Sequence, residues 1–131
     1  MHFCSDGRCG GQGDLACHPD DDDPAVDHDF TLMIDDWRLD QDGQIDDASF
    51  GSLHDWSHAG RLGNWLTDNG TSDPVLSVKP GARLRLRLIN AANARIFKIK
   101  IGDAVATLIA EDGAVCLPKQ IDTVELAPGQ R

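Results

Sequence analysis

Hydrophobic and polar residues alternate strictly in two segments of the second half of the chain, residues 83–88 and residues 97–101. A period of two is typical of a β-strand with one buried face. In the first segment we expect the leucines to face a core and the arginines to face away from it. Apolar segments at residues 30–34, 104–110 and 121–126 predict further strands.

Turn signals separate these segments. They are Asp42-Gly43, Asn69-Gly70, Pro80-Gly81, Gly102-Asp103, Asp112-Gly113 and Pro128-Gly129, and such pairs favour tight chain reversal. Residues 44–70 are polar, and we expect a long structured connection there without regular elements. Short strands at close spacing, with no amphipathic helix, predict an all-β domain of antiparallel strands, either a sandwich or a barrel.

The composition divides the 131 residues into an acidic tail and one domain. Residues 1–29 are rich in Cys, Gly and Asp and lack apolar periodicity, so we expect them to be disordered. The domain then covers residues 30–131. No apolar run approaches the roughly 20 residues that cross a bilayer, and no signal peptide is recognisable. We therefore expect no membrane association, and the localisation of the chain stays open.

The net charge of −10 is unevenly distributed along the chain. Residues 1–28 hold seven acids and one base, whereas residues 79–100 contain seven bases and no acid. The overall acidity argues against a nucleic-acid partner, which requires a basic surface. Five bases alternate with apolar residues, and we expect them to share one exposed sheet face: Arg83, Arg85, Arg87, Lys98 and Lys100.

Residues 32–131 resemble the second, or middle, cupredoxin-like domain of the multicopper oxidases, particularly the bacterial laccase and copper-tolerance types. Four segments carry the resemblance: Asp35-Asp36-Trp37-Arg38-Leu39; Gly60-Arg61-Leu62-Gly63-Asn64 with Leu66-Thr67-Asp68-Asn69-Gly70; Pro80-Gly81 with Arg85-Leu86-Arg87-Leu88-Ile89-Asn90-Ala91; and Asp112-Gly113 with Ala127-Pro128-Gly129-Gln130-Arg131. The resemblance implies a Greek-key β-sandwich or barrel of the cupredoxin (plastocyanin-like) type. Because the family pattern continues into a further strand after Arg131, we expect a C-terminally truncated domain, with an open sheet edge that favours self-association.

The resemblance also implies where copper lies. Family members hold it in the first and third domains, through His-x-His motifs and a Cys, whereas the middle domain has none. No two histidines of this chain are separated by one residue; the five are His2, His18, His28, His54 and His58. The family's substrate-contacting carboxylate has no counterpart in residues 90–94. We therefore assign no catalytic, cofactor-binding or metal-binding residue, and expect the chain alone to bind no stoichiometric copper and to be inactive.

The activity implied by the resemblance belongs to a longer parent protein. Such a parent oxidises phenols, aromatic amines or Cu(I) and reduces O₂ to water, and its family is usually periplasmic or exported. This domain would be a copper-free spacer, and its partners would be the flanking cupredoxin domains. The alternative is a free-standing β-sandwich interaction module without chemistry.

Two sets of residues have the side chains of a zinc site. His54 and His58 are one helical turn apart, but the glycines that follow make a helix doubtful, and a loop is the preferred interpretation. Cys4, Cys9 and Cys17 with His18 match no standard ligand spacing, and free thiols in a disordered tail are preferred. The roles of these residues stay open.

Three further signals have simpler interpretations. Asp40-x-Asp42-Gly43 is similar to part of a calcium loop but lacks the carboxylates at its ends, which favours an Asp-Gly turn. Asn69-Gly70-Thr71 is a glycosylation sequon, and we interpret it as a turn. Cys116 has no histidine nearby in sequence, and His54 and His58 would have to fold back onto it to complete the Cys-His set of a blue copper site, so we expect no such site.

Overall fold

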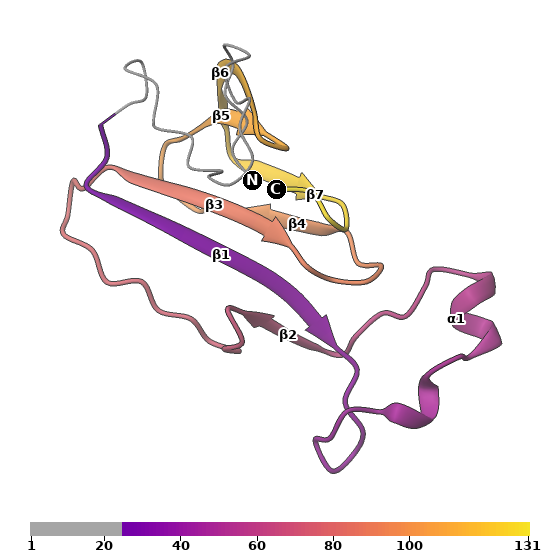
Figure 1. The fold of residues 1–131 in the computed structure, drawn as a ribbon. Helices are drawn as coiled ribbons and strands as arrows, with labels where there is room; N and C mark the ends of the chain where they lie inside the picture. The colour runs from indigo at the N-terminus through magenta and orange to yellow at the C-terminus, as the bar shows by residue number, and fades with distance from the viewer. Residues whose placement is uncertain (1–24) are drawn as a thin grey trace, which may run out of the picture.

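The computed structural model describes residues 25–131 as small β-sheets joined by loops (Figure 1). β1 (His28–Trp37) is the central strand of the first sheet, between β2 (Trp65–Asp68) and β3 (Leu84–Asn90). β2 runs antiparallel to β1, whereas β3 runs parallel to it. The prediction of antiparallel pairing is therefore wrong for β1 and β3. A parallel pair needs a long crossover, and residues 38–83 supply it.

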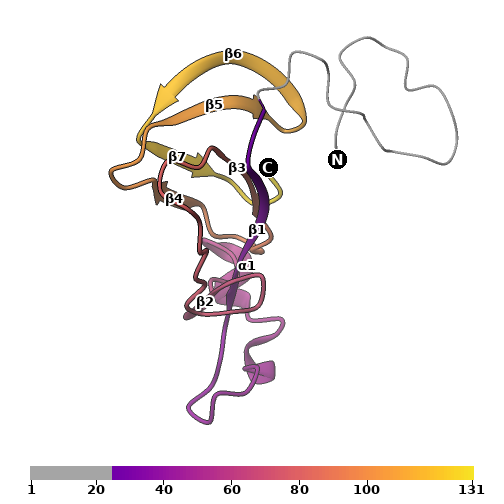
Figure 2. The same ribbon diagram turned by 90° about the vertical axis from the view of Figure 1, so that its left-hand side faces the viewer.

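Two further pairs of strands complete the described part of the chain (Figure 2). β4 (Phe97–Lys100) pairs with β7 (Thr123–Leu126), and β5 (Ala106–Glu111) pairs with β6 (Ala114–Ile121), both antiparallel. Strands dominate and helix is scarce, so the all-β prediction is confirmed. No helix among residues 25–131 is long and apolar enough to cross a membrane.

β1 begins two residues before the expected domain start at Phe30. The Asp27 amide donates to the Arg83 carbonyl at 2.8 Å, and the Arg83 amide donates to the Asp27 carboxylate at 2.7 Å. These bonds align the start of β1 with β3, where His28 lies opposite Leu84. The expected tail residues 1–24, with Cys4, Cys9, Cys17 and His18, lie outside the described residues, and their interpretation stays a prediction.

Residues 44–70 contain regular elements that the sequence did not predict. They form a 3-10 turn (Asp47–Ser49), the single-turn helix α1 (Leu53–Ser57) and the strand β2. β2 carries no alternating pattern of its own, and it is a strand because four of its residues pair with β1. The expectation of a connection without regular elements is therefore wrong.

β6 was also missed, because Pro118 lies within it and the alternation is weak. A proline is tolerated on an edge strand, where its missing N–H faces no neighbour. β6 pairs with β5 alone. The hairpin turn between them was predicted correctly, since Asp112 and Gly113 have φ of 49° and 80°.

The alternation in β3 is real, but its faces differ from the expectation. Leu84 and Leu86 are 36% and 41% exposed, whereas the Arg85 side chain is only 13% exposed. The expected single basic face is wrong as well, because β3 and β4 belong to different sheets. A period of two shows only that the two faces of the strand carry different residue types. Which face is buried depends on the rest of the fold.

The buried core of the described residues is small. Phe97 and Leu126 lie opposite each other on β4 and β7, and both are buried together with Ala92. The most deeply buried residue of the described part of the chain is polar: Asn90, at the end of β3, is 1% exposed. The apolar core and the buried Asn90 therefore lie in the same place, where β3, β4 and β7 come together.

Candidate functional site

A network of polar side chains lies beside the C-terminal end of β1. Asp36 is buried, and its Oδ2 accepts hydrogen bonds from the Gly63 amide and from Nε of Arg95, the latter at 2.8 Å. Arg95 also donates to the Gly63 carbonyl at 2.7 Å. A Cβ at Gly63 would lie 2.6 Å from the backbone nitrogen of Trp37, so only glycine permits this approach. Asp36 therefore joins three distant segments.

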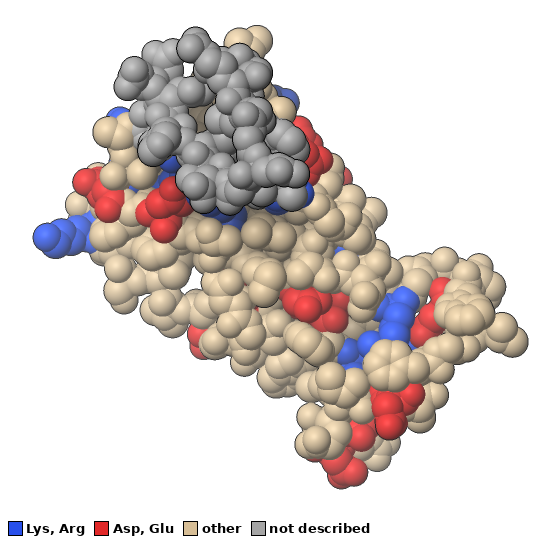
Figure 3. All heavy atoms as spheres, in the orientation of Figure 1, with Lys and Arg blue, Asp and Glu red and all other residues tan. Residues whose placement is uncertain are grey.

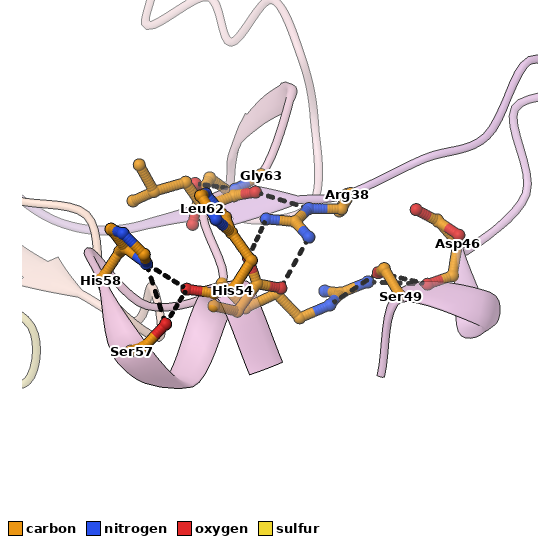
Figure 4. A network of polar contacts seen from close by, with 11 residues as sticks. Arg38, Asp46, Ser49, His54, Ser57, His58, Leu62 and Gly63 are labelled. Atoms are coloured by element: carbon orange, nitrogen blue, oxygen red, sulfur yellow. Dashed lines mark hydrogen bonds and ion pairs between the residues drawn. The ribbon is translucent and has the colours of Figure 1, made fainter. Parts of the chain in front are cut away.

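Arg38 forms a second junction, between β1 and the segment that contains α1 (Figure 4). Its Nε donates to the Leu62 carbonyl at 2.8 Å, and its two terminal nitrogens bond both carboxylate oxygens of Asp55, at 2.7 and 3.2 Å. This bidentate hydrogen bond lowers the pKa of Asp55 below its ordinary value, although partial burial opposes the shift. The same bond raises the pKa of Arg38. The ion pair thus stabilises the charged form of both side chains.

The remaining contacts fix the loop on either side of α1. Arg61 donates to Ser49 Oγ at 3.2 Å and to the Asp46 carbonyl at 3.0 Å, and its guanidinium lies 4.4 Å from the centre of the Phe50 ring. Asn64 and Leu39 exchange two hydrogen bonds, of 2.8 and 2.9 Å. In Figure 3, acidic and basic side chains gather in this region, at the lower right of the molecule.

A hollow of about 200 Å³ lies against this network. It is lined by Asp35, Asp36, Trp37, Arg38, Ile45, Phe50, Arg61, Ala91 and Asn93. Small-molecule sites usually enclose about 300 Å³ or more, and two of the charged side chains that line this hollow, Asp36 and Arg38, already form ion pairs with Arg95 and Asp55. The hollow is therefore a poor candidate for a substrate pocket.

Asn90 is the other polar junction, and sequence reasoning did not single it out. Its side-chain nitrogen donates to the carbonyls of Arg95 and Leu126, at 2.7 and 2.8 Å, and its oxygen accepts from the Ala92 amide at 2.9 Å. Its backbone nitrogen donates to the Gln130 carbonyl at 3.0 Å. Asn90 lies in the segment 85–91, one of the four that resemble the family, and that resemblance is the sequence signal that could have identified it.

His54 of α1 and His58, the residue that caps its C-terminus, come together, but no third ligand from residues 25–131 joins them. Their rings stack with centroids 4.4 Å apart. Among residues 25–131, no group of three His, Cys, Asp or Glu side chains could hold a metal ion. Cys116 lies on β6, far from α1 (Figure 1). The described residues therefore do not fit the one-Cys, two-His set of a blue copper site.

The turn interpretations account for the other signals. Asp40 Oδ1 accepts the amides of Asp42 and Gln44, at 2.9 and 2.8 Å, and Gly43 has φ of 74°. This is a capped turn in which the carboxylate bonds the backbone. Asn69 has φ of 49°, and its side chain bonds the Thr31 carbonyl at 2.9 Å, so the sequon amide is engaged in fixing β1.

Acidic side chains on neighbouring strands offset part of the positive charge of residues 79–100. Arg87 bonds both carboxylate oxygens of Asp29, at 2.9 and 2.7 Å, and Arg85 lies 3.8 Å from the same carboxylate. Lys98 pairs with Glu125 across β4 and β7 at 2.8 Å. These partners are distant in sequence, which is why the segment looked purely basic.

Comparison with known proteins gives concordant results. The family model described as "Multicopper oxidase" matches residues 28–131. The cell division protein FtsP of Edwardsiella tarda is 38% identical over 107 residues, which cover 79% of this chain and 21% of that protein. The chain thus spans about a fifth of the length of this curated relative.

Two solved structures have the same fold. The multi-copper oxidase from Pseudomonas thermotolerans is 27% identical with a TM-score of 0.73, over 80% of this chain and 25% of that one. Lac15 from a marine microbial metagenome is 35% identical with a TM-score of 0.59, over 82% of this chain and 25% of that one. The predicted cupredoxin-like fold is confirmed by this likeness.

Proposed function

This chain belongs to the multicopper oxidase family, and we propose that it acts there as a copper-free structural domain that packs between neighbouring cupredoxin domains of a longer protein. The observation that carries the proposal is the set of hydrogen bonds made by residues of the family-like segments. Asp36, Arg38, Gly63, Asn64 and Asn90 bond backbone groups or each other. Their side chains therefore stabilise the fold of the domain, which supports a structural role.

Exposed apolar side chains support packing against neighbours. Val105, Val115 and Leu117 of the β5–β6 region are 85%, 72% and 91% exposed, and the leucines of β3 are partly exposed. Exposed apolar patches mark interaction sites in soluble proteins, and we propose that these side chains belong to one. Neighbouring domains of the same parent would cover it, and a free-standing interaction module would instead offer it to separate partners.

Two activities of the parent are candidates. The first is oxidation of phenols, aromatic amines or Cu(I) coupled to the reduction of O₂ to water, with copper held in the other domains. The second is a role in cell division, and it is favoured by the name of relatives 33–38% identical to this chain, cell division protein FtsP. In either case the proposed role of this domain is the same, because it rests on packing and not on chemistry.

The experiment that separates these candidates reads the DNA on both sides of the segment and then purifies the complete protein. Cupredoxin segments with His-x-His motifs, together with bound copper and phenol oxidation, support the oxidase. Cupredoxin segments without those motifs, and a metal-free protein, support the division role. A reading frame with no cupredoxin segment on either side would overturn the spacer proposal and leave the interaction module.

A second test addresses the domain itself. The chain with Cys4, Cys9 and Cys17 replaced by serine is reconstituted with copper and assayed with a phenol. We expect no intense blue colour and no oxidation, because no histidine pair from residues 25–131 lies beside Cys116. One tightly held copper per chain with intense blue absorption would contradict the proposal.

A further inference from the structure

The hollow of about 200 Å³ beside the end of β1 has a wall that is apolar over part of its surface. Trp37, Ile45 and Phe50 line it, and these residues are 41%, 46% and 61% exposed. Ala91, the residue after β3, adds a small apolar side chain to the wall. The wall thus combines β1, the loop before α1 and the end of β3. The described part of the chain leaves this apolar surface open.

The charged side chains of the same wall are engaged within the domain. Asp36 and Arg38 form the ion pairs described above. Arg61 donates to two oxygen atoms of residues 46–49, and Asp35 accepts the amide of Asp36 at 2.8 Å. A charged group that entered the hollow would compete with these contacts, and burying a charge without a partner is unfavourable. The hollow therefore favours an uncharged, apolar group.

The apolar wall is also fixed in position by contacts within the domain. Trp37 Nε1 donates to Thr67 Oγ at 3.1 Å, which holds the indole ring. The Arg61 guanidinium lies 4.4 Å from the centre of the Phe50 ring. Groups that are already ordered lose little conformational freedom when a partner binds, and this lowers the cost of association. The hollow therefore has the preformed shape of a docking site.

We propose that this hollow receives one leucine, methionine or phenylalanine side chain from another domain of the longer parent protein. The inference rests on the proposed structural role, and it adds the place where a neighbouring domain docks. A cavity of about 150 Å³ accommodates a benzene-sized group, so the volume of this hollow suits a single apolar side chain. An anchor of this kind, seated in a pocket, commonly dominates the energy of a protein interface.

Two observations favour a domain of the same protein as the occupant. The chain spans 21% of FtsP from Edwardsiella tarda and 25% of the multi-copper oxidase from Pseudomonas thermotolerans, so most of a protein of that kind lies outside it. One side chain in a small hollow gives weak binding by itself, and a covalent connection compensates by raising the effective concentration. Most of the wall also comes from the family-like segments: Asp35, Asp36, Trp37, Arg38, Arg61 and Ala91.

Thiol labelling tests whether the hollow is occupied. Ala91→Cys places a thiol in its wall at an exposed position. The chain alone and the complete protein, each with this substitution, are treated with iodoacetamide, and labelling of that cysteine is followed by mass spectrometry. The matched control is Ser72→Cys, at an exposed position in the loop between β2 and β3. We expect labelling at position 91 to be at least about tenfold slower in the complete protein, because buried thiols are inert, and labelling at position 72 to be unchanged.

Three outcomes of the labelling would overturn the inference. Fast labelling at position 91 in a complete protein that has flanking cupredoxin domains would leave the structural role standing without this docking site. A complete protein without such domains would remove the structural role and the inference together. Slow labelling of the chain alone at high concentration would identify a second copy as the occupant. Equal slowing at positions 91 and 72 would show general shielding, which also contradicts an occupied hollow.

Filling the hollow provides a second measurement. Ala91→Phe places a phenyl group from the chain itself in the proposed site, where it would exclude the partner's side chain. The urea midpoint of the chain alone should stay unchanged, and that of the complete protein should fall. Ser72→Phe is the size-matched control and should change neither midpoint. An unchanged complete protein would show that nothing docks there, and an equal fall in the chain alone would show that the hollow cannot hold an apolar side chain.

Discussion

Two regions of this chain lie outside its small core, and they are held in different ways. Residues 38–64, between β1 and β2, are fixed by side chains, above all by Arg38, Arg61 and Arg95. The β5–β6 hairpin is fixed by backbone pairing and its Asp-Gly turn, while Leu117 is 91% exposed. The first region has its polar groups engaged, and the second has its apolar groups uncovered.

The two regions differ in the kind of interaction that holds them. Hydrogen bonds that involve a charged group are stronger than those between neutral groups. An isolated two-stranded hairpin is only marginally stable in water. Residues 38–64 are thus held by their own side chains, whereas the hairpin is held by backbone pairing and by two hydrogen bonds between Asp112 and Arg131. Substitutions in the two regions should therefore have very different effects.

The largest effect is expected from Asp36→Ala. The Asp36 side chain is fully buried, and its loss leaves Arg95 and the Gly63 amide without their acceptor. Removing one partner of a buried ion pair typically costs about 3 kcal/mol. The free energy of unfolding, measured with urea, should fall by that amount. Asp42→Ala is the matched control, and a similar loss there would mean that acidic charge in general sets the stability.

Gly63→Ala should have the next largest effect. The added methyl would approach the Trp37 backbone to 2.6 Å, and backbone atoms cannot turn aside as a flexible side chain can. Overpacking of this kind costs about 2 kcal/mol. The control is Gly43→Ala, which meets no atom within 4 Å and pays only for its positive φ, about 1 kcal/mol. Equal losses would show that the close approach at Gly63 contributes nothing.

Arg38→Met should change the pH dependence of stability. The Arg38 hydrogen bond lowers the pKa of Asp55 in the folded state. A carboxyl with a lowered pKa stabilises the fold above its unfolded pKa, and this contribution is lost as the pH falls through the folded value. Between about pH 6 and pH 3, the urea midpoint of Arg38→Met should therefore decrease less than that of the parent sequence. Parallel curves would contradict this.

The smallest effect is expected in the hairpin. Leu117→Lys changes an exposed side chain, so the chain alone should lose less than about 0.5 kcal/mol. In the complete protein, a neighbouring domain that buries Leu117 would make the same change cost about 2 kcal/mol. Thermal unfolding of both proteins makes the comparison. An unchanged complete protein would show that this surface is not a domain contact.

The sequence alone determined the features that depend on neighbouring residues. Alternation over residues 83–88 and 97–101 identified β3 and β4, because side chains of a strand alternate between its faces. Asp112-Gly113 identified a hairpin turn, because these residues accept positive φ. Four ordered segments carried enough of the family pattern to identify the family without a structure.

Only the tertiary structure decided the features that depend on distant residues. Asp36 and Arg95 are 59 positions apart, and nothing local in either segment names the other as its partner. β2 is a strand because β1 accepts it, and Leu84 is exposed because no described element covers that face fully. Local pattern specifies conformation, whereas pairing, burial and charge compensation depend on which segments the complete fold brings together.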